Sequence, residues 1–211
     1  MSLNSYISKQ FSNPTGLSGK LMSLIMNYQN QPLYTEIIQF LSLSDSDSVL
    51  DIGCGNGYVL NLLARQYNSS FTGIDTSPSI IQAAFRRNHI FVENGRMKLL
   101  CQDVNSMPFA DGSFHKAYSI NTVYFWDDLN STMFEIWRVL RPNGVFMNTL
   151  YSNETLATFA HTQYGYKQYT KEQLTIAGTN AGFSVHVVPV LHGTAYCFLY
   201  QKMNEHYNCT N

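Results

Sequence analysis

The chain has 211 residues, of which 45% are hydrophobic and 13% charged, so it is long and apolar enough to bury a sizeable core. Its formal net charge of -1 does not favour nucleic acid as a partner. The sequence lacks the apolar run of about 18 residues that a transmembrane helix needs, and its N-terminus lacks the basic start and apolar stretch of a signal peptide. These features predict a cytoplasmic protein with no membrane partner.

The cysteines and histidines show no spacing typical of a metal site. The four cysteines form no CxxC pair, and the six histidines form neither HxxxH nor HExxH. We therefore expect reduced thiols, as in an intracellular compartment, and no bound metal.

The N-terminal segment, residues 1–44, is predicted to contain two helices after an irregular start. Residues 1–16 are polar and irregular, and apolar residues then recur at helical spacing over 17–28. Pro32 suits the first turn of a second helix, which continues to position 41. We expect this segment to lie over a ligand pocket as a lid.

Strands and helices alternate over residues 45–202, which we interpret as the core of a single domain, 1–211, with a frayed tail at 203–211. The expected strands are 48–53, 70–75, 97–101, 114–120 and 145–150, and the expected helices are 57–67, 78–94, 131–140 and 170–181. Such alternation indicates βαβ units and a mainly parallel sheet.

Two further strands, 183–190 and 194–202, are predicted at the end of the chain. Their connection, residues 191–193, is too short for a parallel crossover, so the two strands should form an antiparallel hairpin. The predicted fold is therefore α/β: a Rossmann-like, doubly wound sheet of seven strands, mostly parallel with a C-terminal antiparallel hairpin, and with helices on both faces.

A glycine-rich turn follows the first predicted strand. Residues 49–57 read Val-Leu-Asp-Ile-Gly-Cys-Gly-Asn-Gly, and a helical pattern begins directly afterwards. Glycine tolerates positive φ and lets the backbone approach a ligand where a Cβ would clash. An ordinary tight turn needs only one glycine, so this arrangement predicts a nucleotide-binding turn.

Polar residues also stand at the carboxyl ends of the predicted strands, where open α/β sheets bind their ligands. They are Asp51, Asp75, Asp103 and Asn121. Asp75 can accept two hydrogen bonds from a ribose diol. Asp103 can accept one from an adenine amino group, while the backbone at Val104 donates to the ring. The set as a whole indicates an adenosine ligand.

The turn does not match the dinucleotide pattern G-x-G-x-x-G/A. Gly53 and Gly55 fit, but Tyr58 occupies the sixth position. Asp51 would also bring a negative charge close to any diphosphate, and the chain has no Gly-Lys-Ser/Thr phosphate loop. A cationic ligand beside Asp51 agrees better with these residues.

The turn at 49–57 resembles motif I of the class I S-adenosylmethionine-dependent methyltransferases. Gly73-Ile74-Asp75 is similar to the second acidic motif of that family, and Gln102-Asp103 with Met107-Pro108-Phe109 to its adenine-side motif. The segment 135–144 resembles the helix, proline and glycine that precede its fifth strand. Together these motifs cover about residues 48–150.

The resemblance implies S-adenosylmethionine as the cofactor and S-adenosylhomocysteine as the product. It places Asp51, Gly53 and Gly55 at the methionine end, Asp75 at the ribose, and Asp103 with Val104 at the adenine. We expect four further cofactor contacts, from Asn27, Cys54, Thr76 and Asn121. Asn121 also departs from the family's amine-methylating DPPY motif, so the sequence does not argue for methylation of adenine or amide nitrogen.

Less is indicated about the methyl acceptor. Aromatic residues outside the common sheet predict a small, partly apolar acceptor, and the expected pocket residues are Tyr124, Trp126, Tyr164 and Tyr196. The candidates for a general base are His161, His192 and Asp127, and no spacing singles one out. The chain has no room for a separate domain for nucleic acid or protein substrates, so we expect a small-molecule substrate and a monomer or homodimer.

Two other functions agree with the same motifs. A non-catalytic S-adenosylmethionine-binding or partner protein would need the same aspartates for binding alone. An NAD-binding oxidoreductase is the third reading, and Tyr58 disfavours it.

Overall fold

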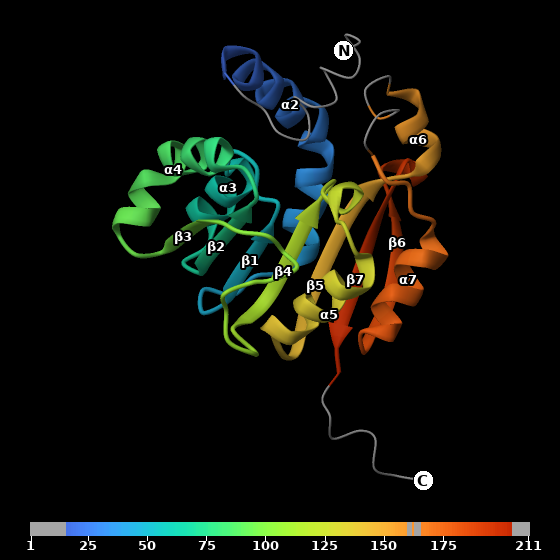
Figure 1. Ribbon diagram of the computed structural model, residues 1–211. Coiled ribbons are helices and arrows are strands. Elements are labelled where there is room, and N and C mark those ends of the chain that lie inside the picture. Colours follow the sequence, from blue (N-terminus) through green and yellow to red (C-terminus); the bar gives the residue numbers. More distant parts are fainter. Residues whose placement is uncertain (1–15, 160–161, 163–165, 204–211) are drawn as a thin grey trace.

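The computed structural model describes residues 16–159, 162 and 166–203, with the side chains of 16–27 and 29 left out. A seven-stranded sheet runs through the molecule in the order β3-β2-β1-β4-β5-β7-β6 (Figure 1). The strands are β1 (Ser48–Ile52), β2 (Ser70–Asp75), β3 (Met97–Cys101), β4 (Phe114–Ile120), β5 (Leu140–Tyr151), β6 (Phe183–Val190) and β7 (Ala195–Lys202). The first five strands pair in parallel, whereas β7 is antiparallel to both β5 and β6. The predicted mixed sheet with a C-terminal hairpin is confirmed.

Helices cover both faces of this sheet. They are α2 (Gly16–Leu41), α3 (Tyr58–Gln66), α4 (Pro78–Glu93), α5 (Leu129–Val139), α6 (Asn153–Thr158) and α7 (Lys171–Asn180). One buried cluster joins the sheet to α5 and α7 through Met133 and Leu174, and a second joins it to α2 and α3 through Leu33 and Leu60. The fold is therefore doubly wound, as the alternating pattern predicts. Each helix in the described part of the chain is too short or too polar to cross a bilayer.

The N-terminal helix differs from its prediction. The structure has one helix, α2, that continues through Pro32, so the predicted second helix starting at Pro32 is wrong. An internal proline costs a helix about 3 kcal/mol. Leu33, Ile37 and Leu41 follow it and are 0%, 0% and 1% exposed, and each buried aliphatic side chain contributes about 1.5–3 kcal/mol. Burial against the sheet therefore outweighs the local penalty.

Strand β5 also begins earlier than predicted, at Leu140 instead of Val145. Leu140 pairs with Phe114, an irregularity follows, and Val145 then pairs with Lys116. Asn143 lies in this irregular stretch with a φ of 62°. The proline and glycine of the segment thus make a bulge within the strand, not a turn before it.

Candidate active site

A cavity of about 420 Å³ opens at the carboxyl ends of β1, β2 and β4, within the size range of small-ligand sites. It lies where the strand order reverses, because β2 and β4 flank β1 on opposite sides. The described residues that line it include Asp51, Gly53, Cys54, Gly55, Asp75, Thr76, Asp103, Val104 and Asn121. The structure therefore brings together all the predicted cofactor residues except Asn27. Asn27 lies in α2, and its side chain is outside the described ones.

Asp51 lies in β1, and the residue is 4% exposed. The hydroxyl of Tyr118, on the neighbouring strand β4, donates to Asp51 Oδ2 at 2.7 Å. Burial raises the pKa of Asp51 to about 7, the Tyr118 hydrogen bond opposes that rise, and the negative charge of Asp75 adds to it. Asp51 is thus a buried acid that a nearby cation would bring into its charged form.

The glycine turn depends on its glycines in two different ways. Gly53 has a φ of 73°, and a Cβ on it would lie 2.4 Å from Cγ2 of Thr122. Gly55 has a φ of 53°, but a Cβ there would meet nothing within 4 Å. Gly53 is therefore needed for close packing, whereas Gly55 faces open space in the wall of the cavity.

Asp75, the last residue of β2, is held by the backbone around it. Its Oδ2 accepts from Gly55 N at 3.2 Å and its Oδ1 accepts from Ser77 N at 2.9 Å. Burial raises the pKa of Asp75, and these backbone hydrogen bonds counteract the rise. These backbone donors orient the carboxylate before anything binds.

Asp103 and Val104 follow β3 at the rim of the cavity. Asp103 is exposed, and its Oδ1 accepts from the backbone N of Asn105 at 2.8 Å and from its Nδ2 at 2.9 Å. Val104 is 8% exposed. A hydrogen-bond acceptor and an apolar surface are thus adjacent here, which is the combination that a planar nucleobase requires.

Asn121 joins three elements at the end of β4. Its φ is 56°, and its Nδ2 donates to Asn30 Oδ1 in α2 at 2.9 Å. Its Oδ1 accepts from the Tyr124 hydroxyl at 3.2 Å and from Tyr151 N, at the end of β5, at 3.3 Å. This network holds α2 against the cavity wall.

The network also includes residues that the sequence analysis missed. Asn30 and Tyr34 both line the cavity from α2. Tyr34 is 8% exposed, and burial raises the pKa of its hydroxyl. Asn27, Asn30 and Tyr34 are separated by three and four positions and so share one face of a helix, which is a periodic signal that could have identified them.

Not all of the residues predicted to line the methyl-acceptor pocket lie at the cavity. Trp126 lines the cavity, together with its neighbour Phe125. Tyr124 is 1% exposed and lies behind them without lining the cavity. Tyr196 is also absent from the lining, and the ammonium group of Lys171 lies 4.8 Å from its ring centroid. Tyr164 lies outside the described residues.

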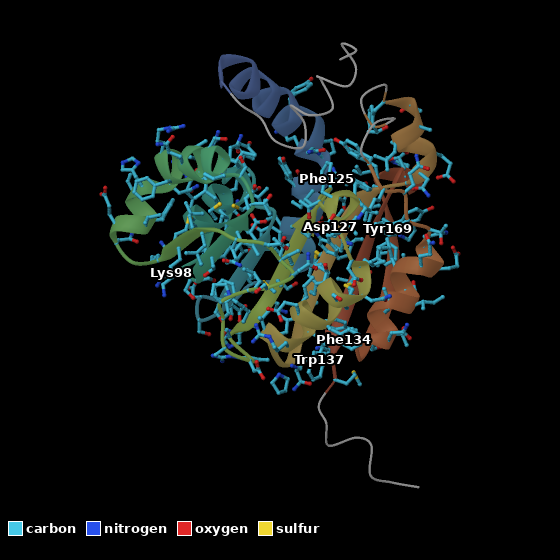
Figure 2. All side chains as sticks on the ribbon, in the orientation of Figure 1. Lys98, Phe125, Asp127, Phe134, Trp137 and Tyr169 are labelled. Carbon is cyan, nitrogen blue, oxygen red and sulfur yellow. The ribbon has the colours of Figure 1, made fainter. Side chains whose placement is uncertain are left out.

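Of the three general-base candidates, only Asp127 is found in the described cavity lining. Asp127 lines the cavity, as Phe125 does, and lies in the segment that leads from β4 to α5 (Figure 2). Its Oδ1 is 3.6 Å from Lys167 Nζ. His192 is exposed in the turn between β6 and β7 and does not line the cavity, while His161 lies outside the described residues.

The charged side chains that line the cavity are all acidic among the described residues. The described lining residues include Asp51, Asp75, Asp103 and Asp127, and among them is no lysine, arginine or histidine. A site with this lining attracts a cation and repels a diphosphate.

Comparison with known proteins agrees with this site. Residues 50–148 match the family model described as "Methyltransferase domain". An O-methyltransferase of Pyrenophora dematioidea is 33% identical over 109 residues, covering 52% of this chain and 41% of that protein. The sterol 4-C-methyltransferase strm-1 of Caenorhabditis elegans is 35% identical over 118 residues, covering 54% and 34%. The chain thus spans less than half the length of these two relatives.

Solved structures share the fold across nearly the whole chain. A chain from the complex of the Haloferax volcanii Trm112 methyltransferase activator with its methyltransferase has a TM-score of 0.79 at 18% identity, covering 96% of this chain and 100% of that one. The geranyl diphosphate C-methyltransferase of Streptomyces coelicolor has a TM-score of 0.71 at 12% identity, covering 92% and 87%. The fold of this chain, with aspartates at the carboxyl ends of its strands, is similar to that of these methyltransferase structures. Residues 50–148 are thus similar to a methyltransferase domain, and over the rest of the chain the likeness is one of fold.

Proposed function

We propose that this chain binds S-adenosylmethionine in the cavity and transfers a methyl group to a small-molecule acceptor. The observation that carries the proposal is the charge of the cavity, which is lined by the glycine-rich turn and four aspartates and by no described cationic side chain. S-adenosylmethionine carries positive charge at its sulfonium and ammonium groups, which suits this lining. A dinucleotide would instead bring its diphosphate close to Asp51.

The described residues fit the cofactor along its length. Asp51 offers a carboxylate at the methionine end, beside the open wall at Gly55. Asp75 offers two oriented oxygens for a ribose diol. Asp103 and Val104 offer an acceptor and an apolar surface for the adenine. These roles are part of the proposal.

The bound cofactor supplies a methyl group that is already activated for displacement. The protein's contribution is then chiefly to hold the acceptor in line with that group and to exclude water. Tyr34, Phe125 and Trp126 supply the apolar surface that could position an acceptor. Asp127 is the one base candidate that lines the described cavity, and its carboxylate could accept a proton if the acceptor loses one.

The acceptor class is proposed from the same aromatic residues. Their apolar surface suits a small, partly apolar molecule. Among the relatives, the names include a sterol methyltransferase and a malonyl-[acyl-carrier protein] O-methyltransferase from Halorhodospira halophila, the latter 28% identical over 165 residues and covering 74% of this chain and 54% of that protein. These names support methyl transfer and leave the acceptor to be found by experiment.

A second candidate is a protein that binds the cofactor without methyl transfer. The solved structure titled "[4+2]-Cyclase SpnF" has a TM-score of 0.71 at 20% identity, covering 81% of this chain and 80% of that one. The fold thus also occurs in a protein named for a different reaction, and fold alone does not decide the activity.

Calorimetry with S-adenosylmethionine and with NAD, followed by methyl transfer to a metabolite extract read by mass spectrometry, tests the proposal. We expect binding of S-adenosylmethionine, no binding of NAD, and a product heavier by one methylene unit. NAD binding without S-adenosylmethionine binding would refute the cofactor assignment. Binding of S-adenosylmethionine without transfer to any extract component would favour the non-catalytic candidate.

A further inference from the structure

We propose that Tyr118 is a positioning residue for the cofactor site, whose hydroxyl favours the charged form of Asp51 and leaves the second carboxylate oxygen for a cationic ligand. This inference rests on the proposed function, because Asp51 is taken to bind the cationic end of S-adenosylmethionine. Tyr118 itself does not line the cavity. It would act only through Asp51.

The sheet register places the two residues opposite each other. In the parallel pairing of β1 with β4, Asp51 is the partner of Tyr118. The tyrosine is 0% exposed and the aspartate 4%, and the hydroxyl oxygen lies 2.7 Å from Oδ2. A hydrogen bond to a charged acceptor at this distance, away from water, is among the stronger ones in proteins.

The hydroxyl is the one hydrogen-bond donor to Asp51 among the described residues. It occupies Oδ2, and no described donor occupies Oδ1. Since Asp51 lines the cavity, the arrangement leaves one carboxylate oxygen for a ligand. A phenylalanine at 118 would fill the same core position but would leave Asp51 without this donor.

No other described titratable group facing Asp51 favours its ionisation. Asp75 from β2, Cys54 from the glycine turn and Tyr34 from α2 can only be neutral or negative, and the cavity lining has no described cation. Burial acts in the same direction and raises the pKa of Asp51 to about 7 even with the Tyr118 bond in place. Tyr118 is therefore the described group that favours the carboxylate.

Loss of the hydroxyl should raise the pKa of Asp51 further. Only the ionised carboxylate attracts a cation, so the observed affinity is proportional to the fraction of Asp51 that is ionised. The affinity should therefore fall as the pH drops below the Asp51 pKa. A pKa that is higher by one unit shifts the whole profile upward by one pH unit and lowers the affinity about tenfold below both pKa values.

The test measures S-adenosylmethionine affinity by calorimetry from pH 5.5 to pH 8.5 for wild type, Tyr118→Phe and Tyr200→Phe. Tyr200 is a matched control because it is also 0% exposed and its hydroxyl donates to Leu174 O at 3.3 Å, far from the cavity lining. The ionisation of the ligand itself is common to all three proteins and cancels in the comparison.

For Tyr118→Phe we expect a midpoint that is higher by about one pH unit, with about tenfold weaker binding at pH 6 and a small difference at pH 8.5. Tyr200→Phe should follow the wild-type profile. An unshifted midpoint, or a loss of equal size at every pH, would refute the role of Tyr118 while leaving the cofactor assignment intact. No binding by the wild type would instead refute the proposed function.

A second variant covers the case in which Tyr118→Phe does not fold. Amber-codon suppression can place 3-fluorotyrosine at position 118, which keeps the hydroxyl and makes it a stronger donor. The midpoint should then move to lower pH than in the wild type. A midpoint equal to the wild-type value would contradict the proposal.

Discussion

Asn121 at the end of β4 and Asn30 in α2 are joined by a hydrogen bond of 2.9 Å between their side chains, although they lie 91 positions apart. Asn121 holds this geometry with a left-handed φ of 56°, a conformation that asparagine tolerates better than most residues. The pair ties the N-terminal helix to the wall of the cavity. It is thus a direct target for testing whether α2 supports ligand binding.

We expect Asn121→Ala to lower the free energy of unfolding by about 1 kcal/mol more than Asn121→Gly does. Both variants lose the amide, but only alanine is strained at positive φ. Urea denaturation of the two variants measures the difference. Asn30→Ala, made in the wild type and in both Asn121 variants, completes a double-mutant cycle. A coupling energy near zero would show that the 2.9 Å bond contributes nothing to stability.

Gly53→Ala should destabilise the protein by about 2–4 kcal/mol, because a Cβ there combines positive φ with a clash against Thr122. Gly55→Ala is the matched control, with positive φ but open space, and should cost about 1 kcal/mol. Thermal and urea unfolding give both values. Thr122→Ser removes the Cγ2 atom and should restore part of the loss in Gly53→Ala; equal costs at the two glycines would contradict the packing role of Gly53.

Asp75→Ala should weaken S-adenosylmethionine binding about 100-fold, because two hydrogen bonds to a charged acceptor, worth about 1.5–3 kcal/mol each and partly replaced by water, would be lost. Calorimetry measures the affinity. Asp111→Ala, at an exposed carboxylate that pairs with Arg138 away from the cavity, should bind like the wild type. Unchanged affinity in Asp75→Ala would remove the ribose assignment.

Asp51→Asn should stabilise the ligand-free protein at pH 7.5 while weakening its binding of S-adenosylmethionine. The pKa of Asp51 rises from 3.8 to about 7 on folding, so the folded state holds a proton that the unfolded state has lost between these values. This group therefore lowers stability as the pH rises from about 4 to about 7, and the neutral asparagine avoids that loss.

The gain for Asp51→Asn should be at least about 1 kcal/mol at pH 7.5 and smaller at pH 5, where folded Asp51 is protonated and only part of the loss has accumulated. Urea denaturation at the two pH values measures it, and Asp111→Asn serves as the exposed control. A gain of the same size at both pH values would indicate a packing effect instead of the ionisation of Asp51.

Much of the cavity lining at the strand ends could be predicted from local sequence. Asp75 ends one short strand and Asp103 follows another, and parallel strands bring their carboxyl ends to one edge of a sheet. The glycine turn is likewise local, because its positive φ values depend on residue type. The fold class follows from the same alternation of strands and helices.

The tertiary structure decided the parts that depend on long-range burial and register. Helix α2 continues through Pro32 because the residues after it are buried on the sheet, and that continuity brings Asn30 and Tyr34 to the cavity. Tyr118 meets Asp51 only through the register of β1 with β4, across 67 positions of sequence. Propensity and spacing act over a few residues, whereas these contacts exist only once the whole sheet has paired and its core has been buried.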